Sequence, residues 1–261
     1  MIKMQQKHGA APAAIVNISL HDSAILLDVD GTIVDLAPTP RDVLVVPRLK
    51  IALRTLCQRT DGAVAFVSGR PLGDLDRLFA PLKLAAVAGH GAEMRVSGRD
   101  EPSRYDAPLG GDLRRQFKAL VSKLDGVILE DKGYSLALHY RLAPQHADTI
   151  REAVAAACAV YPKSAIEVLP GKAVIEVKSS AFNKGTGVRE LMRFPPFRGR
   201  SPIFIGDDVT DQAAFSVLPE FGGAGFSVGH KMPGLAGCFP TPQDVREWLY
   251  QLAGDAGPEV R

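Results

Sequence analysis

The stretch AILLDVDGTIVD, residues 24–35, carries the strongest indication of the fold. Four apolar residues run directly into Asp28 and Asp30, which are separated by one valine and followed by Gly31. A short, continuous apolar run is typical of a buried strand in a parallel sheet. In open α/β sheets, ligands bind beyond the carboxyl ends of the strands, so both acids are predicted to face a binding site. Gly31 allows a sharp turn after them.

Strands and helices alternate along much of the remaining chain. Apolar residues recur at helical spacing from residue 47 to 56, GAVAFVSGR (62–70) resembles a second buried strand, and LGDLDRLF (72–79) begins another helix. SPIFIGDDVTD (201–211) is again a buried strand that ends in acids, and TPQDVREWLYQL (241–252) has the residue order of a capped helix start. This alternation predicts parallel strands joined by crossover helices.

The pattern changes between about residues 87 and 178. Two pairs of strands with alternating polarity surround turns at Lys132-Gly133 and Pro170-Gly171, and a helical pattern precedes each pair. Such hairpins predict an antiparallel sheet, so we expect an α/β, Rossmann-like parallel core with a smaller α+β domain inserted into it. The predicted bounds are a flexible tail at 1–19, a catalytic core at 20–88 and 179–261, and an inserted cap domain at 89–178, with crossings at Ala88-Gly89 and Ser179-Ser180.

Composition narrows the class of protein. The 261 residues carry a formal net charge of +2, which gives no indication of nucleic-acid binding. No run of eighteen apolar residues is present, so we expect no membrane segment. The three cysteines, Cys57, Cys158 and Cys238, are far apart and show no metal-binding spacing. A reducing, cytoplasmic location is therefore expected.

Polar side chains follow apolar strands at four places, where they are predicted to face the binding site. Three or more carboxylates at one edge of a sheet would repel each other, and a divalent cation with oxygen ligands offsets that repulsion. Mg²⁺ suits carboxylates and water better than Zn²⁺ does, since no cluster of Cys and His is nearby. A bound cation would also let a carboxylate attack a phosphate dianion. The four places are Asp28 with Asp30, Ser68 with Gly69 and Arg70, Lys184 with Gly185, and Asp207 with Asp208 and Asp211.

Phosphoryl transfer gives each of these residue types a role. An aspartate with an ordinary pKa of about 3.9 is ionised at neutral pH, so Asp28 is the candidate nucleophile. Asp30 can protonate the leaving oxygen and then activate water, while Thr32 adds a hydroxyl near the phosphate. Ser68 and Lys184 supply a hydrogen bond and a positive charge to the phosphoryl oxygens.

Each motif also has an interpretation without catalysis. A lone DxD can be a turn or a helix cap, and the acids of GDDVTD can favour the positive end of a helix. Ser68-Gly69-Arg70 can be an ordinary strand-to-helix turn, and Lys184 can be a solvated helix residue. It is the joint order of the motifs that favours an active site.

In this order, DVDGT, SGR, KG and GDDVTD resemble the four motifs of the haloacid dehalogenase (HAD) superfamily of phosphotransferases, from Ile25 to about Phe226. The segment between the second and third motifs resembles the larger α/β cap of that superfamily. GHGAE, LEDKGYSLALHYR, GKAVIEVK and GDDVTDQAAF are similar to segments of trehalose-6-phosphate phosphatases. The resemblance implies Mg²⁺-dependent hydrolysis of trehalose 6-phosphate, the last step of trehalose biosynthesis, through an aspartyl-phosphate intermediate.

The resemblance also implies roles for single residues. Asp28 would be phosphorylated and Asp30 would be the general acid and base. Mg²⁺ would be held by Asp28, the backbone carbonyl of Asp30 and Asp207, with Asp208 and Asp211 acting on it indirectly or through water. The residues expected to contact the substrate are Thr32, Gly69, Arg70, Glu130, Lys132 and Glu176.

In the predicted cap, Glu130 and Lys132 share one face of a strand, and Glu176 and Lys178 share another. Acid and ammonium groups side by side can hydrogen-bond the hydroxyls of a sugar. The alternative is a solvated outer face with ion pairs between strands. The resemblance favours sugar binding for Glu130, Lys132 and Glu176, whereas His139 is expected to be structural. Many relatives carry EvRP where this chain has EVKSS, so no role is carried over to Lys178 or Ser179.

Other functions remain open at this point. Within the fold, the chain can be a phosphatase of another sugar phosphate, of the sucrose 6-phosphate or mannosylglycerate phosphate type, or a phosphohexomutase. A different class is a non-catalytic module that binds a sugar phosphate and regulates a partner. The presence of both Asp28 and Asp30 speaks against that module. We expect a small sugar phosphate as the partner, a monomeric state and a functional association with trehalose-6-phosphate synthase.

Overall fold

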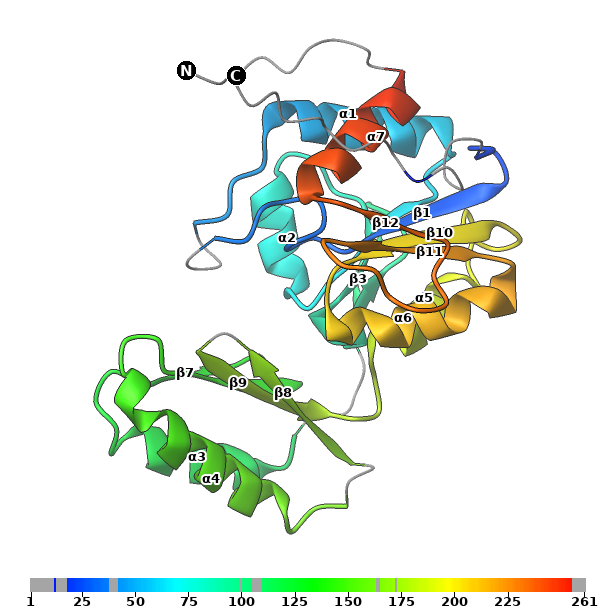
Figure 1. Cartoon of the computed structure of the whole chain (residues 1–261). Coiled ribbons are helices and arrows are strands. Elements are labelled where there is room, and N and C mark those ends of the chain that lie inside the picture. Colours follow the sequence, from blue (N-terminus) through cyan, green and yellow to red (C-terminus); the bar gives the residue numbers. More distant parts are fainter. Residues whose placement is uncertain are drawn as a thin grey trace, which may run out of the picture. The chain divides into compact units, whose positions relative to one another are not determined.

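The chain consists of two compact units (Figure 1). One contains the residues up to Arg104 and from Asn183 onward, and the other runs from Tyr105 to Phe182. We call them the core unit and the inserted unit. Almost all of the tail predicted at 1–19 lies outside the described residues. This computed structural model describes residues 12, 18–37, 42–98, 100–104, 109–162, 165–171 and 173–254.

The core unit is built on one eight-stranded sheet. Its strands are β1 (Ser23–Leu27), β2 (Val64–Val67), β3 (Ala85–Ala88), β4 (Glu93–Arg95), β5 (Ser103–Arg104), β10 (Ser201–Gly206), β11 (Ala224–Val228) and β12 (Gly237–Phe239). They lie in the order β12-β11-β10-β1-β2-β3-β4-β5, and all pairings are parallel except those of β4. From β1 the chain proceeds to one side through β2 and β3, and β10 to β12 occupy the other side. The strand order therefore reverses next to β1, where α/β sheets bind ligands.

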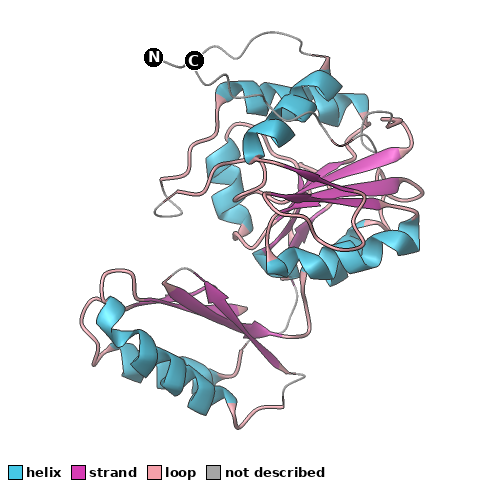
Figure 2. Cartoon of the chain, in the orientation of Figure 1, coloured by secondary structure: helices cyan, strands magenta, loops and turns pink. Residues whose placement is uncertain are grey.

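Helices cover both faces of this sheet, as Figure 2 shows. On β1, Ile25 and Leu27 pack in the apolar cluster that includes α1, α2 and α7. Ala24 and Leu26 point the other way, into the cluster that includes α5 and α6. This burial on both faces is why the strands are almost continuously apolar, and the predicted parallel α/β core is confirmed. The helices are α1 (Pro47–Arg59), α2 (Leu72–Phe79), α5 (Lys184–Leu191), α6 (Gln212–Val217) and α7 (Pro242–Ala253), with short 3₁₀ helices η2 (Gly89–Gly91), η4 (Val209–Asp211) and η5 (Leu218–Phe221).

The inserted unit has its own four-stranded antiparallel sheet in the order β6-β7-β9-β8. One face of the sheet packs Leu136, Leu138, Ile175 and Val177 against two helices. Alternate residues of the same strands form the opposite, polar face. The predicted antiparallel sheet is confirmed. The elements are α3 (Gly111–Val121), β6 (Ile128–Asp131), β7 (Ser135–His139), η3 (Pro144–His146), α4 (Ala147–Cys158), β8 (Ile166–Gly171) and β9 (Val174–Ser179).

The bounds of the inserted unit differ from the predicted 89–178. Directly after β3, the turn at residues 89–91 reverses the chain, so that β4 pairs back onto β3 with Glu93 beside Ala88. The predicted crossing at Ala88-Gly89 therefore lies inside the core unit. At the other end, the buried Lys178 ammonium donates to the carbonyl of Phe182 at 2.6 Å and keeps the residues after β9 on the inserted unit. The predicted Pro170-Gly171 turn is also displaced, because β8 continues through Gly171.

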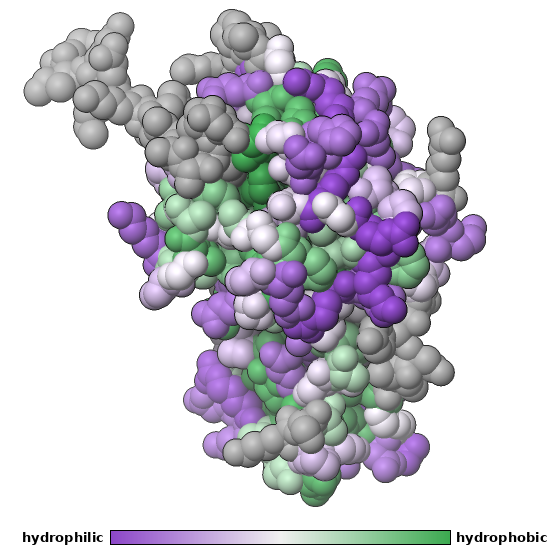
Figure 3. Space-filling view, turned by 90° about the vertical axis from the view of Figure 1, so that its right-hand side faces the viewer, coloured by the Kyte–Doolittle hydropathy of each residue, from purple (hydrophilic) through white to green (hydrophobic). Residues whose placement is uncertain are grey.

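One face of the molecule is drawn by hydropathy in Figure 3. In Figure 3, hydrophobic residues are interspersed with hydrophilic ones over the visible face. Scattered apolar residues of this kind are normal on a folded protein. Within the described ranges, no helix has both the length and the apolar character needed to cross a bilayer.

Candidate active site

The polar residues predicted from the strand ends meet at one edge of the core sheet. Asp28 follows β1, Asp207 follows β10 and Ser68 follows β2. Because β1 pairs with both β10 and β2, with Leu27 beside Ile205 and Phe66, these three strand ends are neighbours. Helix α5 begins nearby at Lys184, whose ammonium reaches the Asp28 carboxylate.

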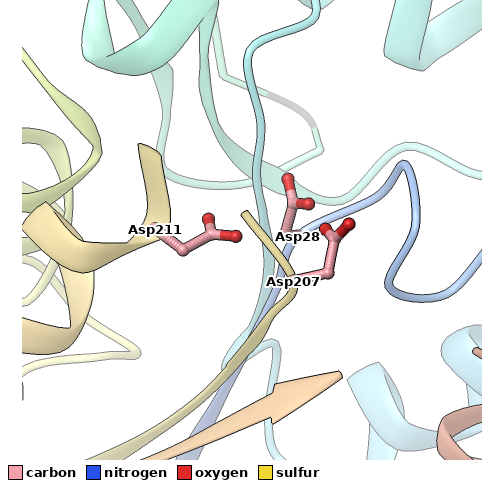
Figure 4. Close-up of side chains that lie close together, drawn as sticks. All are labelled: Asp28, Asp207 and Asp211. Carbon is pink, nitrogen blue, oxygen red and sulfur yellow. The ribbon is translucent and has the colours of Figure 1, made fainter. Parts of the chain in front are cut away.

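Three carboxylates form a cluster at this edge. Asp28, Asp207 and Asp211 each place an oxygen within 4.8 Å of the other two, and Figure 4 shows Asp211 directed toward the other pair. The hydroxyl of Thr32 lies 3.3 Å from Asp28 Oδ2 and 3.1 Å from Asp207 Oδ1, so it can donate to either one. Gly31 has φ +77°, and a Cβ there would lie 2.1 Å from Asp207 Oδ2. Only glycine therefore permits this close approach.

Lys184 lies between two of the carboxylates. Its side chain is 3% exposed, and Nζ donates to Asp28 Oδ1 at 2.8 Å and to Asp211 Oδ1 at 2.6 Å. Burial alone would lower the pKa of Lys184, but the charges of Asp28 and Asp211 outweigh it and raise this pKa. The lysine is therefore a buried cation, and its interpretation as a solvated helix residue is wrong.

The cluster carries more negative charge than one lysine can neutralise. Burial raises the pKa of the Asp28 carboxyl well above its ordinary value, against the opposing attraction of Lys184 and with the help of Asp211. Burial likewise raises the pKa of Asp207, and the charge of Asp211 adds to the effect. A divalent cation with oxygen ligands would relieve this repulsion, so the cluster fits a site for such a cation.

The three carboxylates are not equivalent as metal ligands. One oxygen of Asp211 accepts from Lys184, and the other accepts from the backbone N–H of Asp208 at 3.0 Å. Both oxygens of Asp211 thus accept from N–H donors, whereas Asp28 Oδ2 and Asp207 Oδ1 share the one hydroxyl of Thr32. Asp28 and Asp207 are therefore better placed to reach a cation directly. The Asp208 carboxylate accepts from the backbone N–H of Val209 at 2.6 Å and caps η4.

Arg70 and Asp30 form a two-point ion pair. Arg70 Nε donates to Asp30 Oδ2 at 2.5 Å, and Nη2 donates to Oδ1 at 2.6 Å, the fork-to-fork geometry that gives strong pairs. Burial would lower the pKa of Arg70, but the hydrogen bonds and charge of Asp30 raise it. The sequence predicted that Arg70 contacts substrate, and here it contacts the predicted acid and base. The buried Ser68 hydroxyl accepts from the backbone N–H of Arg70 at 3.2 Å.

The turn at residues 89–91 was assigned to the cap from its sequence, yet it contacts this site. The backbone N–H of Gly89 donates to the carbonyl of Arg70 at 2.8 Å, and that of His90 donates to Ser68 at 3.0 Å. Two glycines around one histidine are a turn signal, and that signal could have indicated an immediate chain reversal.

The predicted sugar-binding residues lie in the inserted unit. In the sheet register, Glu130 and Glu176 both pair with Ala137, so they share its polar face. Lys132 Nζ lies 3.2 and 3.3 Å from the two carboxylate oxygens of Glu176, and Nε2 of His139 lies 3.0 Å from Glu130 Oε2. These residues therefore form the ion pairs of the alternative interpretation, and they leave polar groups on a partly accessible face.

Comparison with known proteins gives a consistent result. A family model described as trehalose-phosphatase matches residues 26–240. The trehalose-6-phosphate phosphatase of Escherichia coli (strain K12) is 33% identical over 88% of this chain and 86% of its own length. A probable trehalose-phosphate phosphatase of Sinorhizobium fredii is 36% identical over 91% of this chain and 90% of its own length.

Solved structures share the fold at lower identity. The C-terminal domain of the Candida albicans trehalose-6-phosphate phosphatase superposes with a TM-score of 0.75 at 24% identity, covering 90% of this chain and 92% of that one. A HAD-superfamily phosphatase from Bacteroides thetaiotaomicron gives a TM-score of 0.60 at 14% identity, covering 91% and 97%. The C-terminal domain of a Candida albicans trehalose synthase regulatory protein gives 0.66 at 13% identity, covering 89% and 94%.

Proposed function

The chain belongs to the trehalose-phosphatase family of the HAD superfamily, and we propose that it hydrolyses trehalose 6-phosphate to trehalose and phosphate through a phospho-Asp28 intermediate. The observation that carries the mechanism is the placement of Asp28. The residue is 4% exposed at the end of β1, with Lys184 on one carboxylate oxygen and Thr32 near the other. A carboxylate held in this way presents a fixed oxygen to an incoming phosphoryl group.

In the first step, an oxygen of Asp28 forms a bond to phosphorus while the bond between phosphorus and the sugar oxygen breaks. Asp30 donates a proton to the departing sugar oxygen. In the second step, Asp30 takes a proton from water as the water oxygen attacks phosphorus, which releases phosphate and restores Asp28. Lys184 stabilises the charge that develops on the phosphoryl oxygens, and the Ser68 hydroxyl adds a hydrogen bond.

Before Asp30 can act as the acid in the first step, its ion pair with Arg70 must change. Both oxygens of Asp30 accept from the guanidinium, so an Asp30 that carries a proton must release at least one of these bonds. The released arm of Arg70 can then donate to a phosphoryl oxygen. In this way Arg70 serves both Asp30 and the substrate, and the backbone of Gly69 contributes to the loop that contacts the phosphate.

We further propose that the cation is Mg²⁺, held by Asp28, Asp207 and the backbone carbonyl of Asp30. The donor set supports this, since all the candidate ligands are oxygens, and burial together with the nearby charge of Asp211 raises the pKa values of Asp28 and Asp207, which a cation would oppose. When bound, Mg²⁺ would neutralise part of the phosphate charge. Asp211 would support the site through Lys184 and the Asp208 backbone, and Asp208 by capping η4.

The inserted unit would supply the contacts to the sugar. Glu130, Lys132 and Glu176 place acceptors and a donor on one polar sheet face, and such a set suits several hydroxyls at once. Their pairing with one another, and with His139, would preorganise them. The assignment of these three residues to trehalose rests on the family.

A panel of substrates tests the proposal. Wild-type enzyme with Mg²⁺ should release phosphate fastest from trehalose 6-phosphate when this is compared with sucrose 6-phosphate, mannosylglycerate phosphate and glucose 6-phosphate. Asp28→Asn keeps the size of the side chain and removes its charge, so turnover should fall by at least roughly 10³-fold. Faster phosphate release from another sugar phosphate would refute the assignment of trehalose 6-phosphate as the substrate. Substantial turnover by Asp28→Asn would refute the covalent mechanism.

The fold alone does not exclude a non-catalytic module, since one fold neighbour is a domain of a regulatory protein. Binding of trehalose 6-phosphate by the wild-type chain without any phosphate release would favour that second function. A cytoplasmic location, a monomeric state and an association with the synthase remain predictions. Light scattering after size-exclusion chromatography, with and without the synthase, checks the last two.

A further inference from the structure

The turn Gly89–Gly91 has no role in the chemistry proposed above, yet it lies between two segments that have such a role. On one side it donates backbone hydrogen bonds to the carbonyls of Ser68 and Arg70. On the other side Gly91 is so close to the residue before Lys184 that a Cβ at Gly91 would lie 2.3 Å from the carbonyl oxygen of Asn183. The turn thus contacts both the predicted phosphate loop, residues 68–70, and the start of α5.

The residue at the centre of this turn has an unfavourable backbone conformation. His90 has φ 57° and ψ 26°, a left-handed conformation in which residues other than glycine are uncommon. Strain of this kind persists where surrounding contacts hold the residue in place. For His90, the backbone N–H makes one such contact, with the carbonyl of Ser68, and the ring makes another, against Gly69.

The imidazole ring of His90 lies directly against Gly69. A Cβ built on Gly69 would be 2.5 Å from both Cε1 and Nε2 of the ring. The ring therefore occupies the space that a side chain at position 69 would need. The ring therefore packs against the residue that links Ser68 to Arg70 in the chain.

We propose that His90 is a positioning residue for the phosphate loop. Its ring supports Gly69 and its backbone holds Ser68, so the Ser68 hydroxyl and the Arg70 guanidinium keep the places they need. The inference rests on the proposed function, in which this loop contacts the phosphoryl group. Because every phosphate ester presents that group, loss of the ring should affect all substrates alike, whatever the leaving group.

The test uses the full chain and two substrates, trehalose 6-phosphate and p-nitrophenyl phosphate. His90→Gly removes the ring and accepts the left-handed backbone, so the fold should be retained; His90→Asn, which also tolerates that conformation, is a second variant. Both should lower kcat by roughly 10- to 100-fold on both substrates, with KM changed much less, since small misplacements at a reacting centre have effects of this size. His21→Ala, which changes an exposed histidine before β1, is the matched control and should match the wild type.

A reciprocal exchange identifies the contact itself. Gly69→Ala alone should lower kcat and the melting temperature, because its methyl group overlaps the ring. In the double variant Gly69→Ala with His90→Gly, the methyl group fills part of the vacated space, so kcat and melting temperature should exceed those of Gly69→Ala. The proposal would be overturned if the kcat losses of Gly69→Ala and His90→Gly simply multiplied in the double variant. A wild-type kcat in both His90→Gly and His90→Asn would also overturn it, as would a loss of kcat confined to trehalose 6-phosphate.

Failure of this inference can be distinguished from failure of the proposed function. If the wild-type chain releases no phosphate, the function is wrong, and the melting temperatures of the four proteins in the cycle still measure the contact between His90 and Gly69. If the wild type is active and the cycle shows no coupling, only the role of His90 is wrong.

Discussion

Replacing Lys184 by methionine isolates the buried charge at the centre of the site. Methionine retains a long, flexible side chain of similar length and removes the ammonium that pairs with Asp28 and Asp211. One oxygen of each carboxylate lies within 4.8 Å of the others, and two unit charges at that distance repel each other by about 3.5 kcal/mol at an effective dielectric constant of 20. Removing one partner of a buried ion pair typically costs about 3–5 kcal/mol. The free energy of unfolding of the core unit should therefore fall by roughly that amount at pH 7.5 in EDTA.

The pH dependence of this loss has a definite sign. Burial already raises the pKa of Asp28 against the attraction of Lys184, and without the lysine this pKa rises further. A carboxyl whose pKa is higher in the folded state than in the unfolded state lowers the free energy of unfolding as pH rises toward the folded-state pKa. This destabilisation is absent below the unfolded-state pKa of about 4. The difference between wild type and Lys184→Met should therefore shrink on going from pH 7.5 to pH 5.

The assay is urea unfolding followed by tryptophan fluorescence. The chain contains one tryptophan, Trp248, which is buried in α7 of the core unit, so the signal reports that unit. Lys50→Met is the matched control, since the Lys50 ammonium donates to the carbonyl of Ala80 at the surface, and its effect should stay below about 1 kcal/mol. A variant within about 1 kcal/mol of the wild type at pH 7.5, or a deficit that widens on acidification, would refute the reasoning.

Three further predictions concern catalysis. EDTA should abolish phosphate release and Mg²⁺ should restore it, because a cluster of Asp28 and Asp207 with raised pKa values cannot accept a phosphate dianion unaided; full activity after prolonged dialysis against EDTA would contradict the metal site. Asp30→Asn should impair turnover of trehalose 6-phosphate far more than that of p-nitrophenyl phosphate, whose leaving group needs no proton; an unimpaired variant on the sugar phosphate would remove Asp30 from its role. Alanine variants of the cap residues should lose activity on trehalose 6-phosphate and keep most of it on p-nitrophenyl phosphate, since only the sugar needs these contacts; equal loss on both substrates would indicate a structural role. The residues are Glu130, Lys132 and Glu176.

Local sequence patterns were sufficient for the long elements and for the strand ends. Helix α2 spans the predicted residues 72–79, where apolar positions repeat at helical spacing after a proline. The apolar runs of β1 and β10 located Asp28 and Asp207 because parallel strands present their carboxyl ends at one edge. Strands β4 and β5 have only three and two residues, too few for any period to appear. Their place in the core sheet depends on pairing after the turn, which no local pattern records.

The contacts between different motifs could not be predicted from local sequence patterns either. Arg70 and Asp30 are 40 residues apart, and Lys184 and Asp28 are 156 apart, so the spacing within each motif cannot show that they meet. The inward direction of Asp211 depends on the η4 turn, which is capped by Asp208. Residue type predicted phosphate chemistry, whereas the particular partner of each charge required the folded chain.

The two units have separate hydrophobic cores, and this separation bears on how such a protein can evolve. All residues of the two core-unit clusters lie outside 105–182, and all residues of the third cluster lie within that range. Every strand of the eight-stranded sheet likewise comes from outside the insertion. Substitutions within 105–182 can therefore accumulate without loosening the packing that holds Asp28, Asp207 and Lys184 in register. If the inserted unit sets the sugar preference as proposed, changes confined to residues 105–182 can alter that preference while the catalytic residues of the core unit are inherited unchanged.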